Sequence, residues 1–271
     1  MEWGADEALD EQPHDRLAAA FTAAAARPPA MPPPAVAARP SARPAAASAL
    51  PPRADAAPAR PLGGPARQAE DLAAAAGSIE LLRAAVMGFD GCTLRDTASH
   101  TLFAEGDASA GLMLIGEVPD ADEDRAGHPF AGPSGALLDR MLASIGLSRA
   151  GLLITPLIPW RPPGDRKVSP AETAACLPFL YRLLVLAKPS HVVLMGVRPT
   201  RAMLGADASL SRLRGRWLPF TVPGVPAPIQ ALPMRHPGHL MANPLSRREA
   251  WHDLLLLRRT LDGASQGRVD P

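Results

Sequence analysis

The sequence is poor in cysteine and lysine, and it lacks a long apolar run. Its two cysteines, Cys92 and Cys176, cannot form a disulfide framework, so we expect a cytoplasmic protein. No apolar stretch has membrane-spanning length, and the first residues lack a basic region followed by an apolar one, which argues against a membrane span or a secretory signal. The net charge of +1 excludes a strongly basic coat for nucleic acid but leaves room for a local basic face.

Both ends of the chain are predicted to be disordered. Residues 27–67 are a low-complexity stretch of Pro, Ala and Arg that cannot bury enough surface to offset its chain entropy. We therefore predict a disordered N-terminal arm over residues 1–68 and a flexible tail over residues 263–271. Within the arm, residues 15–26 fit a flexible tail best. A short alanine-rich helix and a weakly basic arm that touches nucleic-acid phosphates are the alternatives.

Residues 69–262 are predicted to form one α/β domain. Short apolar runs predict four buried strands, at 112–115, 152–154, 192–195 and 229–233. Helical patterns occupy residues 69–86, 133–145, 169–187 and 199–204 and the segment after 243. This alternation predicts a three-layer α/β/α fold with a four-stranded parallel sheet. Chemistry in such folds lies beyond the carboxyl ends of the strands, which here are followed by the loops 116–132, 155–168, 196–198 and 234–243.

Two of these loops carry the most distinctive residues. An acidic loop and a glycine-rich turn with Phe130 follow the first strand, and His236 follows the fourth. Acidic residues alone fit a solvated loop, and Phe130 alone fits a packed anchor, but neither explains why both segments flank one strand end. The apolar tip at Leu240 and Met241 suits a side chain that wedges into a base stack.

Five motifs along the chain form an ordered set. They are Gly116-Glu117-x-Pro119, Gly127-x-Pro129-Phe130-x-Gly132-x-x-Gly135, Arg161-Pro162-Pro163, Leu213-Arg214-Gly215-Arg216 and His236-Pro237-x-x-Leu240-x-x-Asn243-Pro244. This set, spread over residues 80–261, resembles the uracil-DNA glycosylase superfamily and most nearly its family 4. The resemblance implies a monomeric, bacterial DNA-repair N-glycosylase that acts on single-stranded or uracil-containing DNA. Such an enzyme flips out uracil, or a related damaged base, and excises it to leave an abasic site.

The resemblance also implies roles for particular residues. His236 would donate a hydrogen bond to O2 of the leaving uracil, and the main chain around Glu117 and Val118 would contact the base and hold water. Phe130 would stack on the flipped base, and Leu240 would fill the hole that it leaves. The remaining residues implied in DNA binding are Gly132, Ser134, Gly135, Arg214, Arg216 and Gly238.

The cluster-binding cysteines of family 4 are only half present. The four family positions fall at Phe89, Cys92, Trp160 and Cys176. Two thiolates cannot hold the usual four-ligand iron–sulfur cluster, so we expect no cluster and no other metal. We expect Phe89 and Trp160 to fill the volume of the cluster, with Cys92 and Cys176 remaining as near neighbours.

The base-reading positions also depart from the family pattern. Pro156 stands where the resemblance places an Asn that reads uracil, and proline has no side-chain donor or acceptor. Val118 and Asp120 replace the usual Ala and Gly; Asp120 fits a turn residue better than a substitute polar group at the base. Two functions stay open: a glycosylase with weak or altered base preference, and a relative that binds single-stranded or damaged DNA without efficient cleavage. An unrelated nucleotide-binding protein is a remote third.

Overall fold

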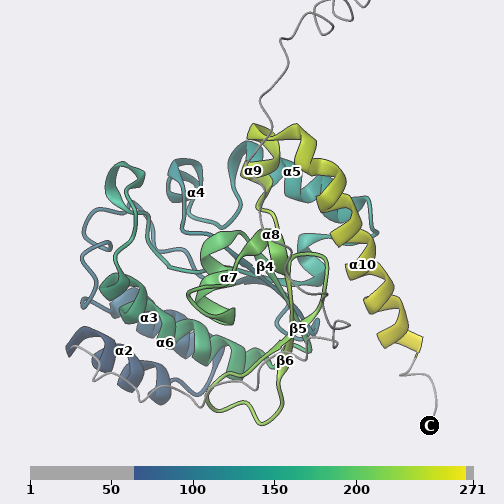
Figure 1. Cartoon of the computed structure of the whole chain (residues 1–271). Helices are drawn as coiled ribbons and strands as arrows, with labels where there is room; N and C mark the ends of the chain where they lie inside the picture. The colour runs from purple at the N-terminus through teal and green to yellow at the C-terminus, as the bar shows by residue number, and fades with distance from the viewer. Residues whose placement is uncertain (1–63, 267–271) are drawn as a thin grey trace, which may run out of the picture. The chain divides into compact units, whose positions relative to one another are not determined.

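The computed structural model describes residues 64–266 (Figure 1). Most of the predicted arm, including the alternative helix at 15–26, lies outside the described residues, as do residues 267–271. The first described helix, α2, covers Gly64–Ala75, so it begins inside the segment predicted to be disordered. The last, α10, covers Arg247–Gln266 and extends past the predicted domain end at 262.

The centre of the fold is a mixed sheet with strand order β1-β3-β2-β4-β6-β5. The four inner strands β2 (Leu112–Gly116), β3 (Leu153–Pro156), β4 (His191–Met195) and β6 (Ile229–Met234) pair in parallel. These are the four predicted strands, and their adjacency is confirmed. Two short edge strands, β1 (Glu105–Gly106) and β5 (Leu218–Phe220), pair antiparallel and were not predicted, because two or three residues carry no readable periodicity.

Helices cover both faces of this sheet, which confirms the predicted three layers. In β2, Met113 and Ile115 face one core with α2, α3 (Ile79–Gly88) and α6 (Pro170–Ala187), while Leu112 and Leu114 face the other. The second core is closed by α5 (Gly132–Ala143), α9 (Pro237–Ala242) and α10. Figure 1 shows these two groups of helices on opposite sides of the strands. Side chains that alternate between two apolar layers explain why the inner strands are continuous apolar runs.

Local sequence sets several helix boundaries. The capping box predicted at Ser169 is present: its hydroxyl accepts from the Glu172 N–H at 3.2 Å, and Glu172 Oε2 accepts from the Ser169 N–H at 2.8 Å. The single helix predicted over 69–86 is instead two helices, α2 and α3. The helix is interrupted around Gly77, and the Ser78 hydroxyl caps α3 by accepting from the Leu81 N–H at 3.2 Å.

The remaining short helices lie in the connections. They are α4 (Ala121–Ala126), α7 (Val197–Leu204), α8 (Leu210–Leu213) and the 3₁₀ turns η1 (Arg149–Gly151), η2 (Pro163–Asp165) and η3 (Pro244–Ser246). Among the described helices only α6 is long and apolar enough to cross a membrane by composition. It packs against α2 and α3 as a core helix, and core helices of soluble domains pass the same test.

Candidate active site at the carboxyl edge of the sheet

The ends of the four parallel strands bring the predicted loops together. Gly116 ends β2 beside Pro156, its register partner at the end of β3. Gly196 follows β4, and His236 lies two residues beyond β6. Two of these positions require glycine. A Cβ on Gly116 would lie 2.9 Å from the Phe130 ring, and one on Gly196, where φ is +121°, would collide with the Glu117 side chain.

Phe130 occupies a tight turn between α4 and α5. Its own φ is +53°, a left-handed conformation that is uncommon for an aromatic residue. Gly135 packs so closely against the Phe130 carbonyl that no Cβ fits between them, and a Cβ on Gly132 would lie 2.5 Å from the Asp122 carboxylate. The glycine spacing of this motif is therefore explained by close packing around Phe130.

His236 lies against this turn with a defined protonation state. It is the N-cap of α9, and the Gly238 N–H donates to its Nδ1 at 3.2 Å. Burial lowers the pKa of His236 to about 4, against a smaller opposing effect of the Asp120 charge. The ring is therefore neutral near pH 7, and because Nδ1 accepts a hydrogen bond, the proton resides on Nε2. His236 thus presents one N–H donor.

The rings of His236 and Phe130 stack on each other. Their centroids are 5.2 Å apart and their planes differ by 22°. Phe130 is only 1% exposed, so no open ring face is left for a third planar group. A base that stacks on this face of Phe130 must displace the His236 ring.

The side chains of Glu117 and Val118 are engaged by other parts of the fold. The Glu117 carboxylate caps α7 by accepting from the Arg198 N–H at 3.2 Å and pairs with the Arg198 guanidinium at 3.6 Å. Burial raises the pKa of Glu117, and those hydrogen bonds lower it by less. Val118 is buried in the core on the α6 side of the sheet. Val118 is therefore left only its main chain to contact a ligand, whereas Glu117 also lines a cleft beside His236.

Asp120 is a turn residue, as the favoured interpretation predicted. Its Oδ1 accepts from the N–H groups of Asp122 and Glu123 at 2.9 and 3.0 Å and so caps α4. Glu123 completes a capping box by accepting from the Asp120 N–H at 2.9 Å. The acidic loop is therefore in large part a capped helical turn.

A cleft of about 320 Å³ opens beside His236. Its wall carries arginine, serine and histidine side chains that the sequence interpretation did not single out, namely Arg201, Ser209, Ser211, Arg235 and His239. Glu117 is its one carboxylate. A cleft of this composition suits an anionic ligand such as a phosphodiester backbone. The one feature of the sequence that pointed to this lining was Arg235, because it directly precedes the histidine motif.

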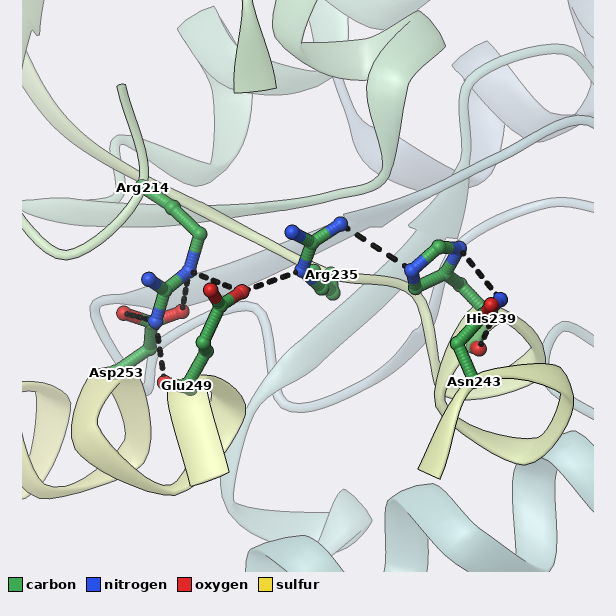
Figure 2. A network of polar contacts seen from close by, with 6 residues as sticks. All are labelled: Arg214, Arg235, His239, Asn243, Glu249 and Asp253. Carbon is green, nitrogen blue, oxygen red and sulfur yellow. Dashed lines mark hydrogen bonds and ion pairs between the residues drawn. The ribbon is translucent and has the colours of Figure 1, made fainter. Parts of the chain in front are cut away.

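Arg214, which was predicted to bind phosphate, forms an ion pair with Asp253 in this structure. Its Nε and Nη2 donate to the Asp253 carboxylate at 3.1 and 2.9 Å, and Nη2 also reaches the Glu249 carbonyl. Glu249 in turn accepts from Arg235 Nε at 2.8 Å, and Arg235 Nη1 lies 3.2 Å from His239 Nε2 (Figure 2). The Arg214 guanidinium therefore ties the chain to α10. Arg216 is exposed and donates to the Arg212 carbonyl at 3.0 Å.

Leu240, the predicted wedge, is buried in this structure. It is 2% exposed and packs into the core between α5 and α10, because it falls on the inner face of α9. The exposed apolar side chains nearby are Met241, at 44%, and Leu245 in η3, at 96%.

Among the other predicted DNA contacts, Ser134 and Gly135 are buried, and Gly238 donates to His236. Gly132 is exposed at the start of α5.

Comparison with known proteins identifies the family. A model of the uracil DNA glycosylase superfamily matches residues 103–255. The chain belongs to this superfamily. It is 30% identical to the type-4 uracil-DNA glycosylase of Pyrobaculum aerophilum over 182 residues, which cover 66% of this chain and 92% of that protein. It is also 30% identical to the type-4 enzyme of Saccharolobus solfataricus over 189 residues, which cover 68% of this chain and 87% of that protein.

One region departs from the family-4 pattern of this superfamily. Phe89 and Trp160 stack with centroids 6.3 Å apart, and both are fully buried. Cys92 and Cys176 are buried free thiols that influence each other: the Cys176 thiol lowers the pKa of Cys92 to about 7, while Cys92 and burial raise the pKa of Cys176. The expected closeness of both pairs is confirmed.

The residues of this region do not fit a four-thiolate cluster. Aromatic rings stand at two of the four positions, and the cavity beside Cys176 measures about 20 Å³, room for about one water molecule. Within residues 64–266, no group of three or more His, Cys, Asp or Glu side chains is arranged to hold a metal ion.

Proposed function

We propose that this protein is a uracil-DNA N-glycosylase, which breaks the bond between N1 of uracil and C1′ of deoxyribose and leaves an abasic site. The observation that carries the proposal is His236, a neutral imidazole with its proton on Nε2, stacked on Phe130 where the parallel strands end. Membership of the superfamily and the names of its type-4 relatives support the same activity.

In this proposal His236 acts on the leaving base. Negative charge develops on uracil as the bond to C1′ breaks, and the Nε2 proton stabilises it at O2 without being transferred. A donor of this kind typically contributes about 2.7–4 kcal/mol to the transition state. Phe130 supplies the stacking surface once the His236 ring has moved aside. The main chain of Glu117 and Val118 contacts the base and holds the attacking water, and Asp120 fixes that loop.

The DNA strand is proposed to run along the cleft beside His236. Arg201 and Arg235 line the cleft, while the exposed Arg216 and Gly132 are further candidates for phosphate contacts. Leu245, almost fully exposed at the tip of η3, replaces Leu240 as the proposed wedge. Single-stranded DNA is the proposed preferred substrate, because its bases need no unpairing.

We also propose that the iron–sulfur cluster of family 4 has been replaced by side-chain packing. Phe89 stacks on Trp160 and meets Phe179 edge-on at 5.1 Å, so three rings fill the region. In this proposal the ring contacts stabilise this part of the core in place of a cluster.

The second candidate function is DNA binding without efficient excision. Pro156 favours it, because it stands at the strand end beside Gly116 and offers no amide to read the uracil edge. The closed contact between His236 and Phe130 favours it as well, since base entry requires that contact to open.

Abasic-site formation separates the two functions. A uracil-containing single strand is incubated with the protein and cleaved with alkali, while affinity for the same strand is measured by fluorescence anisotropy. Excision by the wild type, together with a loss of two to three decades in rate for His236→Ala at unchanged affinity, supports the glycosylase. Tight binding with no cleavage by the wild type supports the binding protein.

A further inference from the structure

The left-handed backbone of Phe130 needs support, because a non-glycine residue keeps that conformation only when its surroundings enforce it. On one side, the Phe130 N–H donates to Glu123 Oε1 at 2.5 Å. The other oxygen of the same carboxylate accepts from the Asp120 N–H at 2.9 Å. Glu123 is buried and so joins the loop after β2 to the Phe130 turn.

The opposite side of the turn is held by Arg149 from η1. Its Nη2 donates to the Phe130 carbonyl at 2.6 Å and its Nη1 to the Pro129 carbonyl at 2.9 Å. Its Nε pairs with Asp139 of α5 at 2.5 Å, which orients the guanidinium. Because the group is planar, one arginine meets two successive carbonyls and a carboxylate at once.

The packing leaves the Phe130 carbonyl no other position. Gly135 lies directly against it, and a Cβ added there would also lie 2.9 Å from Arg149 Nη2. The carbonyl is therefore enclosed by a helix backbone and a guanidinium. Within the described residues, Arg149 bonds to this turn and to α5, and it does not line the cleft beside His236.

We propose that Arg149 is a positioning residue for base stacking: it fixes the left-handed turn that sets the Phe130 ring against His236. This inference rests on the proposed function, because Phe130 is the proposed stacking surface. In this proposal Arg149 acts on catalysis through the orientation of Phe130. Without it, the turn samples other backbone conformations, and the ring is correctly oriented for a smaller fraction of the time.

A double-mutant cycle tests this dependence. Arg149→Gln should lower the rate of uracil release about tenfold, the scale of one lost charged hydrogen bond. It should have no further effect when Phe130 is already alanine. The rate of uracil release by Arg149→Lys should lie between those of the wild type and Arg149→Gln. Lysine keeps the positive charge near Asp139 but cannot donate to both carbonyls together. Losses that multiply in the double variant would overturn the proposal.

Hydrogen–deuterium exchange supplies a readout that does not need activity. Arg149→Gln should speed exchange in peptides covering the Phe130 turn, with little change elsewhere. Arg182 is a matched control, because it donates Nε and Nη2 to the Ala76 carbonyl at 2.9 and 2.7 Å on the other side of the sheet. Arg182→Gln should leave that turn unchanged.

The activity measurement and the exchange measurement test the proposed function and the role of Arg149 separately. A wild type that releases no uracil refutes the proposed function, whereas exchange in the Phe130 turn still decides the role of Arg149. If exchange there is the same in Arg149→Gln and wild type, Arg149 does not hold the turn. Release by both proteins at equal rates would likewise overturn its positioning role.

Discussion

Replacing His236 with alanine should flatten the dependence of stability on pH between pH 7 and pH 4. Burial lowers the pKa of this imidazole from 6.5 to about 4 in the folded protein. In that interval the unfolded chain binds a proton that the folded protein does not. The wild type therefore loses stability as the pH falls from 6.5 towards 4, and the loss levels off below pH 4.

The size of the effect follows from the two pKa values. The gap between 6.5 and about 4 corresponds to about 3 kcal/mol of unfolding free energy. Burial of the ring against Phe130 is the physical source, and the Asp120 charge makes the effect smaller than burial alone would.

Urea unfolding at pH 7 and at pH 4 measures this difference. Between pH 7 and pH 4, the unfolding free energy of the wild type should fall by about 3 kcal/mol more than that of His236→Ala, because the carboxylates titrate alike in both proteins. The exposed His252 on α10 supplies a matched control, and His252→Ala should follow the wild-type curve. Equal losses in wild type and His236→Ala would refute the reasoning that His236 is buried and neutral.

Four further predictions concern the cluster region, the buried Leu240, the wedge and base reading. Protein purified without oxygen should be colourless and free of iron; a brown protein with stoichiometric iron would show the cysteine assignment to be wrong. Leu240→Ala should cost about 2–5 kcal/mol of stability, as core truncations do. Leu245→Ala should leave unfolding unchanged but slow uracil release more from paired than from single-stranded DNA, and equal slowing on both would contradict its wedge role. Pro156→Asn should raise uracil release, and an unchanged rate would mean that the missing amide is not the main defect.

Local sequence was enough to predict the inner sheet and the convergence of the four loops at its carboxyl edge. Each parallel strand is a short apolar run that ends near Gly116, Pro156, Gly196 or His236. Parallel strands place those ends at one edge, so the convergence follows from the pattern. The capping residues Ser169 and Asp120 were also predictable, since an N-cap depends only on the next few residues.

Contacts between distant segments were not predictable. Arg214 was expected at a phosphate, but its partner Asp253 is 39 residues away on a helix whose facing residues no local pattern reveals. Leu240 was assigned to an exposed tip because the sequence did not show that α9 would turn it inward. The stacking of His236 on Phe130 likewise depends on the turn geometry that Arg149 and Glu123 impose.

The most direct test of the proposed site is a crystal structure with a single strand carrying 2′-fluoro-2′-deoxyuridine. This nucleotide resists cleavage because its electron-withdrawing fluorine destabilises positive charge on the sugar. The account predicts that the His236 ring leaves Phe130, that uracil stacks in its place and that Nε2 of His236 donates to uracil O2. A strand bound with uracil away from Phe130, and with His236 still stacked on that ring, would contradict it.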